Sequence, residues 1–176
     1  MPTDEEQDLL RAMLLFASAG LDSLAKQLVR DALPTVLEKS PGATKMFKTF
    51  VERRLKSGDG IDHRLLADVI GDQKPRTRLV ELLIDELTSR SLQSTEELLR
   101  VGSYFDIPSN QITDDAGRLT EIFRARNQIA HEMDVDFTQL NRSRRPRANQ
   151  MMTDYTNEIF GVANSFLSGV DSRLSV

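Results

Sequence analysis

The stretch from Leu10 to Pro34, LRAMLLFASAGLDSLAKQLVRDALP, decides the class of fold. Its apolar residues recur at intervals of three and four, which is the spacing of one face of an α-helix. They are Leu10, Met13, Leu14, Ala17, Leu21, Leu24, Leu28, Ala32 and Leu33. Thr3 and Glu6 precede the run with the spacing of a capping box, and Pro34 ends or kinks it. The sequence therefore predicts a first helix of about 30 residues, or about 45 Å.

The rest of the chain also has helical patterns, because alternating Val, Ile and Thr runs closed by Asn-Gly or Gly-Gly turns are missing. One further helix is predicted to begin near Pro75, and the others to cover about 43–56, 62–70, 94–105, 113–133 and 151–167. We expect one domain, residues 1–176, with an all-α fold: a bundle of long antiparallel central helices and shorter packed helices. A basic loop at about 141–150 and a frayed tail at about 169–176 complete this prediction.

Composition limits the function classes. The 176 residues are 39% hydrophobic and 28% charged, with a net charge of −4 and no cysteine. These values are typical of a soluble protein, and the absence of cysteine excludes disulfides and thiolate metal sites. The chain has no run of eighteen apolar residues and no basic leader at its start, so we expect a cytoplasmic protein without a membrane partner. The negative charge argues against tight non-specific binding of nucleic acid, although a local basic patch could still bind it.

The stretch RARNQIAH, from Arg124 to His131, is the candidate site. At 100° per residue, Arg126 falls near the middle of the predicted core face, although a buried guanidinium needs partners such as Asp22, Asp85 or a second subunit. That face comprises Leu119, Ile122, Phe123, Arg126, Ile129, Ala130 and Met133. A second, polar stripe comprises Thr120, Arg124, Asn127, His131 and Asp134. Residues of this kind on a helix flank are more often solvated than functional, so the pattern alone leaves both interpretations open.

Arg126-Asn-Gln-Ile-Ala-His131 resembles the Arg-Asn-x-x-x-His signature of HEPN domains (higher eukaryotes and prokaryotes nucleotide-binding). Ala19 to Val29 also loosely resembles the opening helix of the RiboL-PSP-HEPN branch. Arg124 fits the signature as well, but we prefer Arg126 because Asn127 follows it directly. HEPN toxins often carry a tyrosine two residues after the histidine, where this chain has Met133.

The resemblance implies a metal-independent endoribonuclease, with Arg126, Asn127 and His131 as catalytic residues and Arg124 as a possible supporting residue. It implies no cofactor and no metal, an RNA substrate, a homodimer with two such helices facing each other, and a role as a toxin or an antiviral or stress effector with an antitoxin protein as a possible partner. Histidine suits proton transfer near neutral pH, and arginine suits the charge that gathers on the phosphate.

The basic loop could add RNA contacts through Arg142, Arg144, Arg145 and Arg147, although such loops are commonly just solvated. The histidine His63 is expected to be structural or exposed. Arg126 and His131 lie about 140° apart on a straight helix. The arginine must therefore extend around the helix, the helix must deform, or a second subunit must complete the site. The alternative function is a non-catalytic HEPN-like module that binds a protein partner or a nucleotide.

Overall fold

The computed structural model describes residues 3–57 and 60–175, and these residues are almost entirely helical, which confirms the all-α prediction. The elements are α1 (Asp4–Asp31), α2 (Leu33–Lys39), α3 (Pro41–Leu55), α4 (His63–Gly71), α5 (Pro75–Thr88), α6 (Thr95–Tyr104), α7 (Ser109–Ile112), α8 (Ala116–Glu132) and α9 (Asn149–Leu174). Two short strands, β1 (Lys56–Ser57) and β2 (Gly60–Ile61), pair antiparallel between α3 and α4. The sequence patterns predict seven of these helices but neither the short helices α2 and α7 nor the two strands.

Local chemistry fixes several helix starts. Thr3 and Glu6 form the predicted capping box at the start of α1. The hydroxyl of Ser94 accepts a hydrogen bond at the start of α6, and the carboxylate of Asp115 does the same at the start of α8. Pro34 does not simply end the first helix; it occupies the first turn of α2, so the chain turns at Ala32 and continues as a second short helix.

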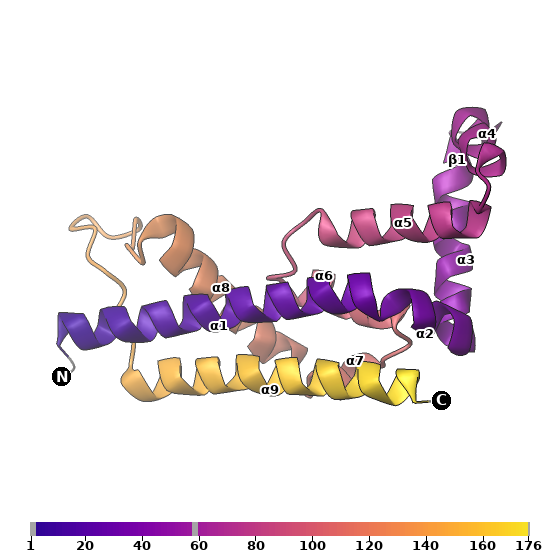
Figure 1. The fold of residues 1–176 in the computed structure, drawn as a ribbon. Helices are drawn as coiled ribbons and strands as arrows, with labels where there is room; N and C mark the ends of the chain where they lie inside the picture. Colours follow the sequence, from indigo (N-terminus) through magenta and orange to yellow (C-terminus); the bar gives the residue numbers. More distant parts are fainter. Residues whose placement is uncertain (1–2, 58–59, 176) are drawn as a thin grey trace.

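The two longest helices, α1 and α9, lie side by side and form the centre of the molecule (Figure 1). They run in the same direction, so the antiparallel arrangement predicted for the long helices is wrong for this pair. The physical reason is that α8 supplies the return path: it crosses α1 in the opposite sense, and the connection from 133 to 148 reverses the chain again before α9 (Figure 1). Helices α3, α4 and α5 lie at the far end of α1 from this connection.

The C-terminal helix is longer than its sequence pattern suggests. The predicted frayed tail begins at Gly169, whereas α9 continues to Leu174 with Val170 fully buried. Two interactions retain this last stretch: Lys39 donates to the Leu174 carbonyl, and Arg173 donates to the Asp106 carbonyl. Tertiary contacts therefore extend the helix past a glycine that would weaken it in isolation.

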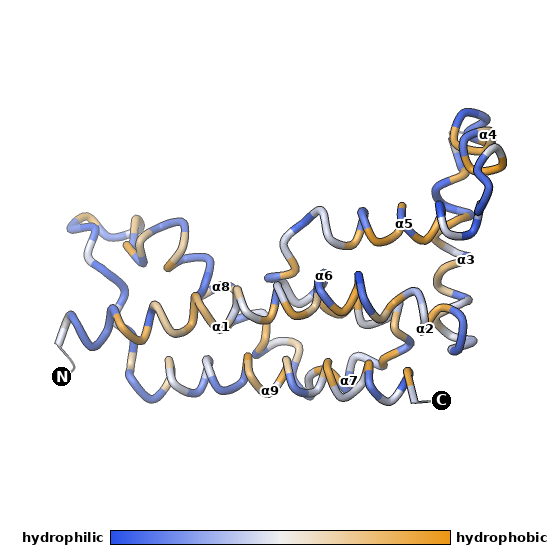
Figure 2. Tube along the Cα trace, viewed as in Figure 1, coloured by the Kyte–Doolittle hydropathy of each residue, from blue (hydrophilic) through white to orange (hydrophobic). Residues whose placement is uncertain are grey.

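A single apolar core joins the helices. Phe105 and Phe166 meet edge to face in it, with ring centroids 5.7 Å apart. Helix α6 comes close to α7 at Gly102, where a Cβ atom would overlap the side chain of Ile112. Figure 2 shows apolar segments along the facing sides of the helices, while the connection between α8 and α9 is largely hydrophilic.

Candidate functional site

Helix α8 carries the candidate catalytic residues and is anchored by one buried face. Leu119, Ile122, Phe123, Ala125 and Ile129 are buried. Arg126 projects from the middle of this face and is half-buried, as its angular position predicts. Two expected members of the face, Ala130 and Met133, are instead exposed. For Met133 the reason is that α8 ends at Glu132 and Met133 adopts the left-handed conformation that caps it, with φ of 51°.

The Arg126 guanidinium reaches around the helix toward the polar stripe. Its Nη1 atom donates to the Asn127 Oδ1 atom at 3.0 Å. Its Nε atom is buried and has no hydrogen-bond partner among the described residues. Three ways to join Arg126 to the polar stripe are predicted. The structure shows an extended arginine, which reaches Asn127.

The electrostatic neighbour of Arg126 is Asp22 on α1. Burial lowers the pKa of Arg126, and the negative charge of Asp22 partly offsets this effect. Asp22 is already engaged, because its carboxylate accepts from Lys26 Nζ at 2.9 Å and from the Leu92 backbone N–H at 2.6 Å. The predicted acidic partner of Arg126 is thus a nearby charge, without a direct ion pair among the described residues.

Three predicted site residues form an exposed row on α8. Arg124, Asn127 and His131 are all exposed, and Asn127 lies one helical turn before His131. The Arg126 guanidinium contacts Asn127, and Asn127 and His131 share one flank of α8. The chain's other histidine, His63, opens α4 at the far end of the molecule, so it cannot serve as a second proton carrier for this flank (Figure 1).

Asp134, predicted as part of the polar stripe, is instead fully buried with 0% of its surface exposed. Its φ of 57° turns the chain away from the helix path and directs the carboxylate inward. Arg11 Nε donates to it at 2.9 Å, and Arg147 Nη2 donates to it at 2.7 Å. Arg11 also donates to the Arg145 carbonyl at 3.1 Å. We call Arg11, Asp134 and Arg147 the buried charge cluster; it fixes the connection between α8 and α9 onto α1.

The four loop arginines predicted to contact RNA have unequal environments. Arg147 belongs to the buried charge cluster, Arg145 pairs with Glu132 at 2.9 Å, and Arg144 pairs with Asp8 at 2.8 Å. Arg142 is exposed and has a φ of 46°. Arg147 is therefore structural in this conformation, while Arg142 and Arg144 remain accessible to an anion.

The sequence patterns do not predict the buried charge cluster. Arg11 lies seven residues before Ser18, and both are buried on the same side of α1 between apolar positions. A charged residue at a core spacing is the only local signal, and its partner Asp134 is 123 positions away. A contact at that separation depends on the fold and cannot be inferred from a periodic pattern.

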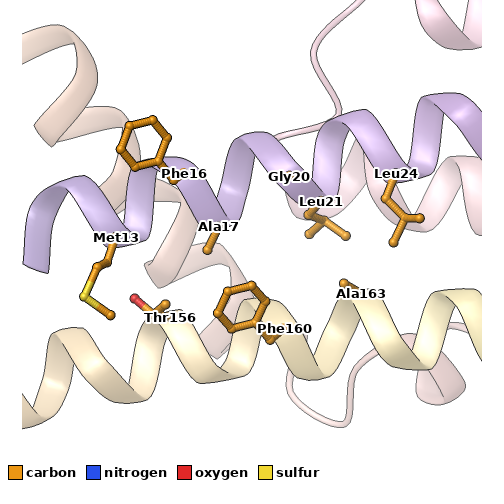
Figure 3. Close-up of a pocket in the computed structure, with 9 residues that line it drawn as sticks. All are labelled: Met13, Phe16, Ala17, Gly20, Leu21, Leu24, Thr156, Phe160 and Ala163. Carbon is orange, nitrogen blue, oxygen red and sulfur yellow. The ribbon is translucent and has the colours of Figure 1, made fainter.

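An apolar groove runs between α1 and α9 on the exposed side of the pair (Figure 3). We call it the α1/α9 groove; its volume is about 430 Å³. It is lined by Met13, Phe16, Ala17, Gly20, Leu21, Leu24, Thr156, Phe160 and Ala163. None of these side chains is charged, so the groove has no group suited to catalysis.

Metal binding and membrane crossing are two further properties that concern the described residues. Within residues 3–57 and 60–175, no group of three or more His, Cys, Asp or Glu side chains is arranged to hold a metal ion. One helix, Glu5–Asp31, is long and apolar enough to cross a membrane by length and composition alone. Helices that form the core of a globular protein meet the same criterion, and this one packs against α8 and α9.

Comparison with known proteins found no similarity: no family model matches the sequence, and no curated protein or solved structure resembles it. The HEPN resemblance therefore rests on the residues from Arg126 to His131 and on the helical character of the chain.

Proposed function

We propose that this chain is a metal-independent endoribonuclease with a HEPN-like fold. The observation that carries the proposal is the position of the Arg126 guanidinium, which is held against Asn127 on the flank that also bears His131. An accessible histidine and an arginine–asparagine pair supply a proton carrier and phosphate-binding donors for cleavage by the RNA 2′-hydroxyl.

The reaction follows from these groups. A base removes the proton from the 2′-hydroxyl, and the 2′-oxygen attacks the adjacent phosphorus. The bond from phosphorus to the 5′-oxygen breaks, and an acid protonates that oxygen, which leaves a 2′,3′-cyclic phosphate and a 5′-hydroxyl. His131 serves as the base or the acid, because an imidazole transfers protons near neutral pH.

Arg126 and Asn127 stabilise the phosphate. The Arg126 guanidinium donates through Nη1 to Asn127, and its other terminal N–H groups can donate to a phosphate oxygen. The amide of Asn127, which accepts from Arg126, can donate through its nitrogen to a second phosphate oxygen. Arg124 is exposed one helical turn before Asn127 and supplies a further positive charge.

One chain provides one histidine on this flank, while the reaction uses both a base and an acid. A homodimer with two α8 helices facing each other supplies the second histidine and doubles the positive charge around the phosphate. We therefore propose that the nuclease acts as a dimer. Its role is that of a toxin or an antiviral effector, with an antitoxin as a protein partner.

The test is cleavage of total RNA by the purified protein in the presence of a chelator. Wild-type protein is expected to cut RNA, and His131→Ala to cut it at least a thousandfold more slowly, since the reaction loses its proton carrier. His63→Ala is the matched control because it removes the other histidine, which is exposed and remote, and should retain full activity. Equal cleavage by wild type and His131→Ala, or none by either, rejects the proposal.

A second function, a non-catalytic module that binds a protein partner, is favoured by one observation. Arg144, Arg145 and Arg147 form ion pairs within the chain, which reduces the positive charge that is free to bind RNA. In that case neither histidine variant would change the phenotype of the protein, and surface substitutions would.

A further inference from the structure

The α1/α9 groove and the candidate nuclease site lie on opposite flanks of α1. Met13 lines the groove, whereas Asp22 is the neighbour of Arg126. These two residues are nine positions apart on one helix, which places them about 180° from each other around its axis. The groove therefore has a role of its own, separate from the proposed chemistry on α8.

The surface of the groove has both projections and a hollow. The Phe16 side chain is 76% exposed and that of Phe160 is 55% exposed, on α1 and α9 respectively. Ala17 lies between the two rings, and Gly20, Leu21, Leu24 and Ala163 line the groove farther along the two helices (Figure 3). The space above Gly20 is open, since a Cβ atom placed there would meet nothing within 4 Å. A side chain from outside therefore fits over Gly20, beside the two phenylalanines.

The apolar face extends beyond the groove along both helices. Leu9 on α1 and Leu167 on α9 lie outside the groove and are also exposed; each is seven positions from Phe16 or Phe160 and so shares its helix face. With Met13, Phe16 and Phe160 they present roughly 500 Å² of apolar side-chain surface, if a fully exposed side chain of this size presents about 150–200 Å². The largest apolar patch on a typical monomer is about 300–600 Å² and is often functional.

We propose that a second copy of this chain packs on the α1/α9 groove, so that the two α1/α9 pairs form a four-helix bundle around a two-fold axis. A typical stable interface buries about 800 Å² per partner, of which about 65% is apolar in homodimers. The apolar surface estimated above is close to that requirement. The Phe16 side chain of each copy enters the hollow over Gly20 of the other.

Self-association is favoured over other partners because this one face supplies both halves of the contact. A two-fold interface requires a surface that is complementary to itself, and a face with projecting phenylalanines beside a small-residue hollow meets that requirement.

This interface leaves the candidate nuclease site accessible. Because Asp22 and Arg126 lie on the opposite flank of α1, the α8 helices of the two copies face outward and remain free to meet a further copy or a substrate. The groove dimer is thus distinct from the dimer of facing α8 helices, and the two can be disrupted independently.

The first experiment measures the oligomeric state by sedimentation equilibrium. Wild-type protein is expected to associate through the groove, and Phe16→Glu should raise the dissociation constant of this step on the order of a thousandfold, because a two-fold axis counts each lost anchor twice. If the α8 helices also pair, the wild type is a tetramer and Phe16→Glu is a dimer; if they do not, the wild type is a dimer and Phe16→Glu is a monomer. Phe137→Glu is the matched control, since Phe137 is also an exposed phenylalanine but lies on the connection between α8 and α9. It should leave the assembly unchanged. Unchanged circular dichroism of both variants verifies that the fold is intact.

The second experiment locates the interface in the cysteine-free chain. Met13→Cys at the edge of the groove should form a covalent dimer with a short bis-maleimide, whereas Gly161→Cys should not, because Gly161 lies on the far side of α9 from the groove. Adding Phe16→Glu to Met13→Cys should abolish the crosslink. A wild type that does not associate, an assembly that Phe16→Glu leaves unchanged, or equal crosslinking at both positions overturns the proposal.

A flotation assay with phosphatidylcholine vesicles tests whether the groove binds lipid instead of a second copy. If a monomeric wild type floats with the vesicles and Phe16→Glu does not, the groove binds lipid and the self-association proposal is wrong. None of these results depends on RNA cleavage, so an inactive protein that still dimerises through the groove refutes only the nuclease.

Discussion

Replacing Asp134 with asparagine tests the buried charge cluster most directly. Asp134 is fully buried and accepts hydrogen bonds from Arg11 and Arg147, whose side chains are 6% and 11% exposed. Asparagine keeps the size of the side chain but removes the negative charge, so two buried guanidinium groups lose their counter-ion. Breaking a buried ion pair by removing one partner costs about 3–5 kcal/mol.

Urea unfolding measures this loss. With a slope of about 2 kcal/mol per molar urea, the midpoint should fall by roughly 1.5–2.5 M. The thermal midpoint should fall by about 10 °C, at about 2–4 °C per kcal/mol for a chain of this size. Glu132→Gln is the control: it breaks the partly exposed pair with Arg145, and such pairs contribute about 0–1 kcal/mol. A loss below about 1 kcal/mol in Asp134→Asn would show that the cluster does not stabilise the fold.

The same residue predicts how stability depends on pH. Burial alone raises the pKa of Asp134, but hydrogen bonds and charge from Arg147 and Arg11 outweigh it, so its pKa is lower than the usual value. A carboxyl with a lowered pKa contributes stability that is present above its unfolded pKa and is lost as pH falls through the folded pKa. Stability should therefore fall below about pH 4 in wild type, and less steeply in Asp134→Asn.

Three other predictions concern backbone, cap and site. Gly161→Ala should stabilise the protein by about 0.5–1 kcal/mol, because its Cβ enters open space in a helix, whereas Gly102→Ala should destabilise it through overlap with Ile112. Thermal unfolding that shows the same sign for both contradicts this. Thr3→Ala should cost about 1 kcal/mol in urea unfolding, because α1 loses its capping box. Arg126→Lys should slow RNA cleavage by about a hundredfold, because lysine lacks the planar fork of N–H donors; wild-type rates in single-turnover assays would argue against a role for Arg126.

Much of the fold follows from local patterns. The capping residues Thr3, Ser94 and Asp115 act on backbone groups three positions away, so short stretches of sequence contain the whole interaction. The buried face of α8 likewise follows from its 3.6-residue period, which also places Arg126 in the middle of that face. These features were predictable because their causes lie within one helix.

The errors occur where distant segments decide. The parallel direction of α1 and α9 depends on the path of α8, and the burial of Asp134 depends on Arg11 and Arg147 arriving from other elements. The extension of α9 past Gly169 depends on Lys39 and Arg173, which make contacts outside the helix. At the site, angular reasoning located Arg126, but only the structure shows its guanidinium bound to Asn127.

The contact between Arg11 and Asp134 also has a consequence for biosynthesis. The two residues are 123 positions apart, and α1 packs on α9, which follows later still. At about 5–20 residues per second, a ribosome needs roughly 6–25 s to extend the chain from one residue to the other. During that interval the part of the apolar face of α1 that packs on α9 has no partner, and its exposure invites aggregation. Slowing synthesis between these two residues should therefore lower the yield of folded protein more than an equal delay near the C-terminus.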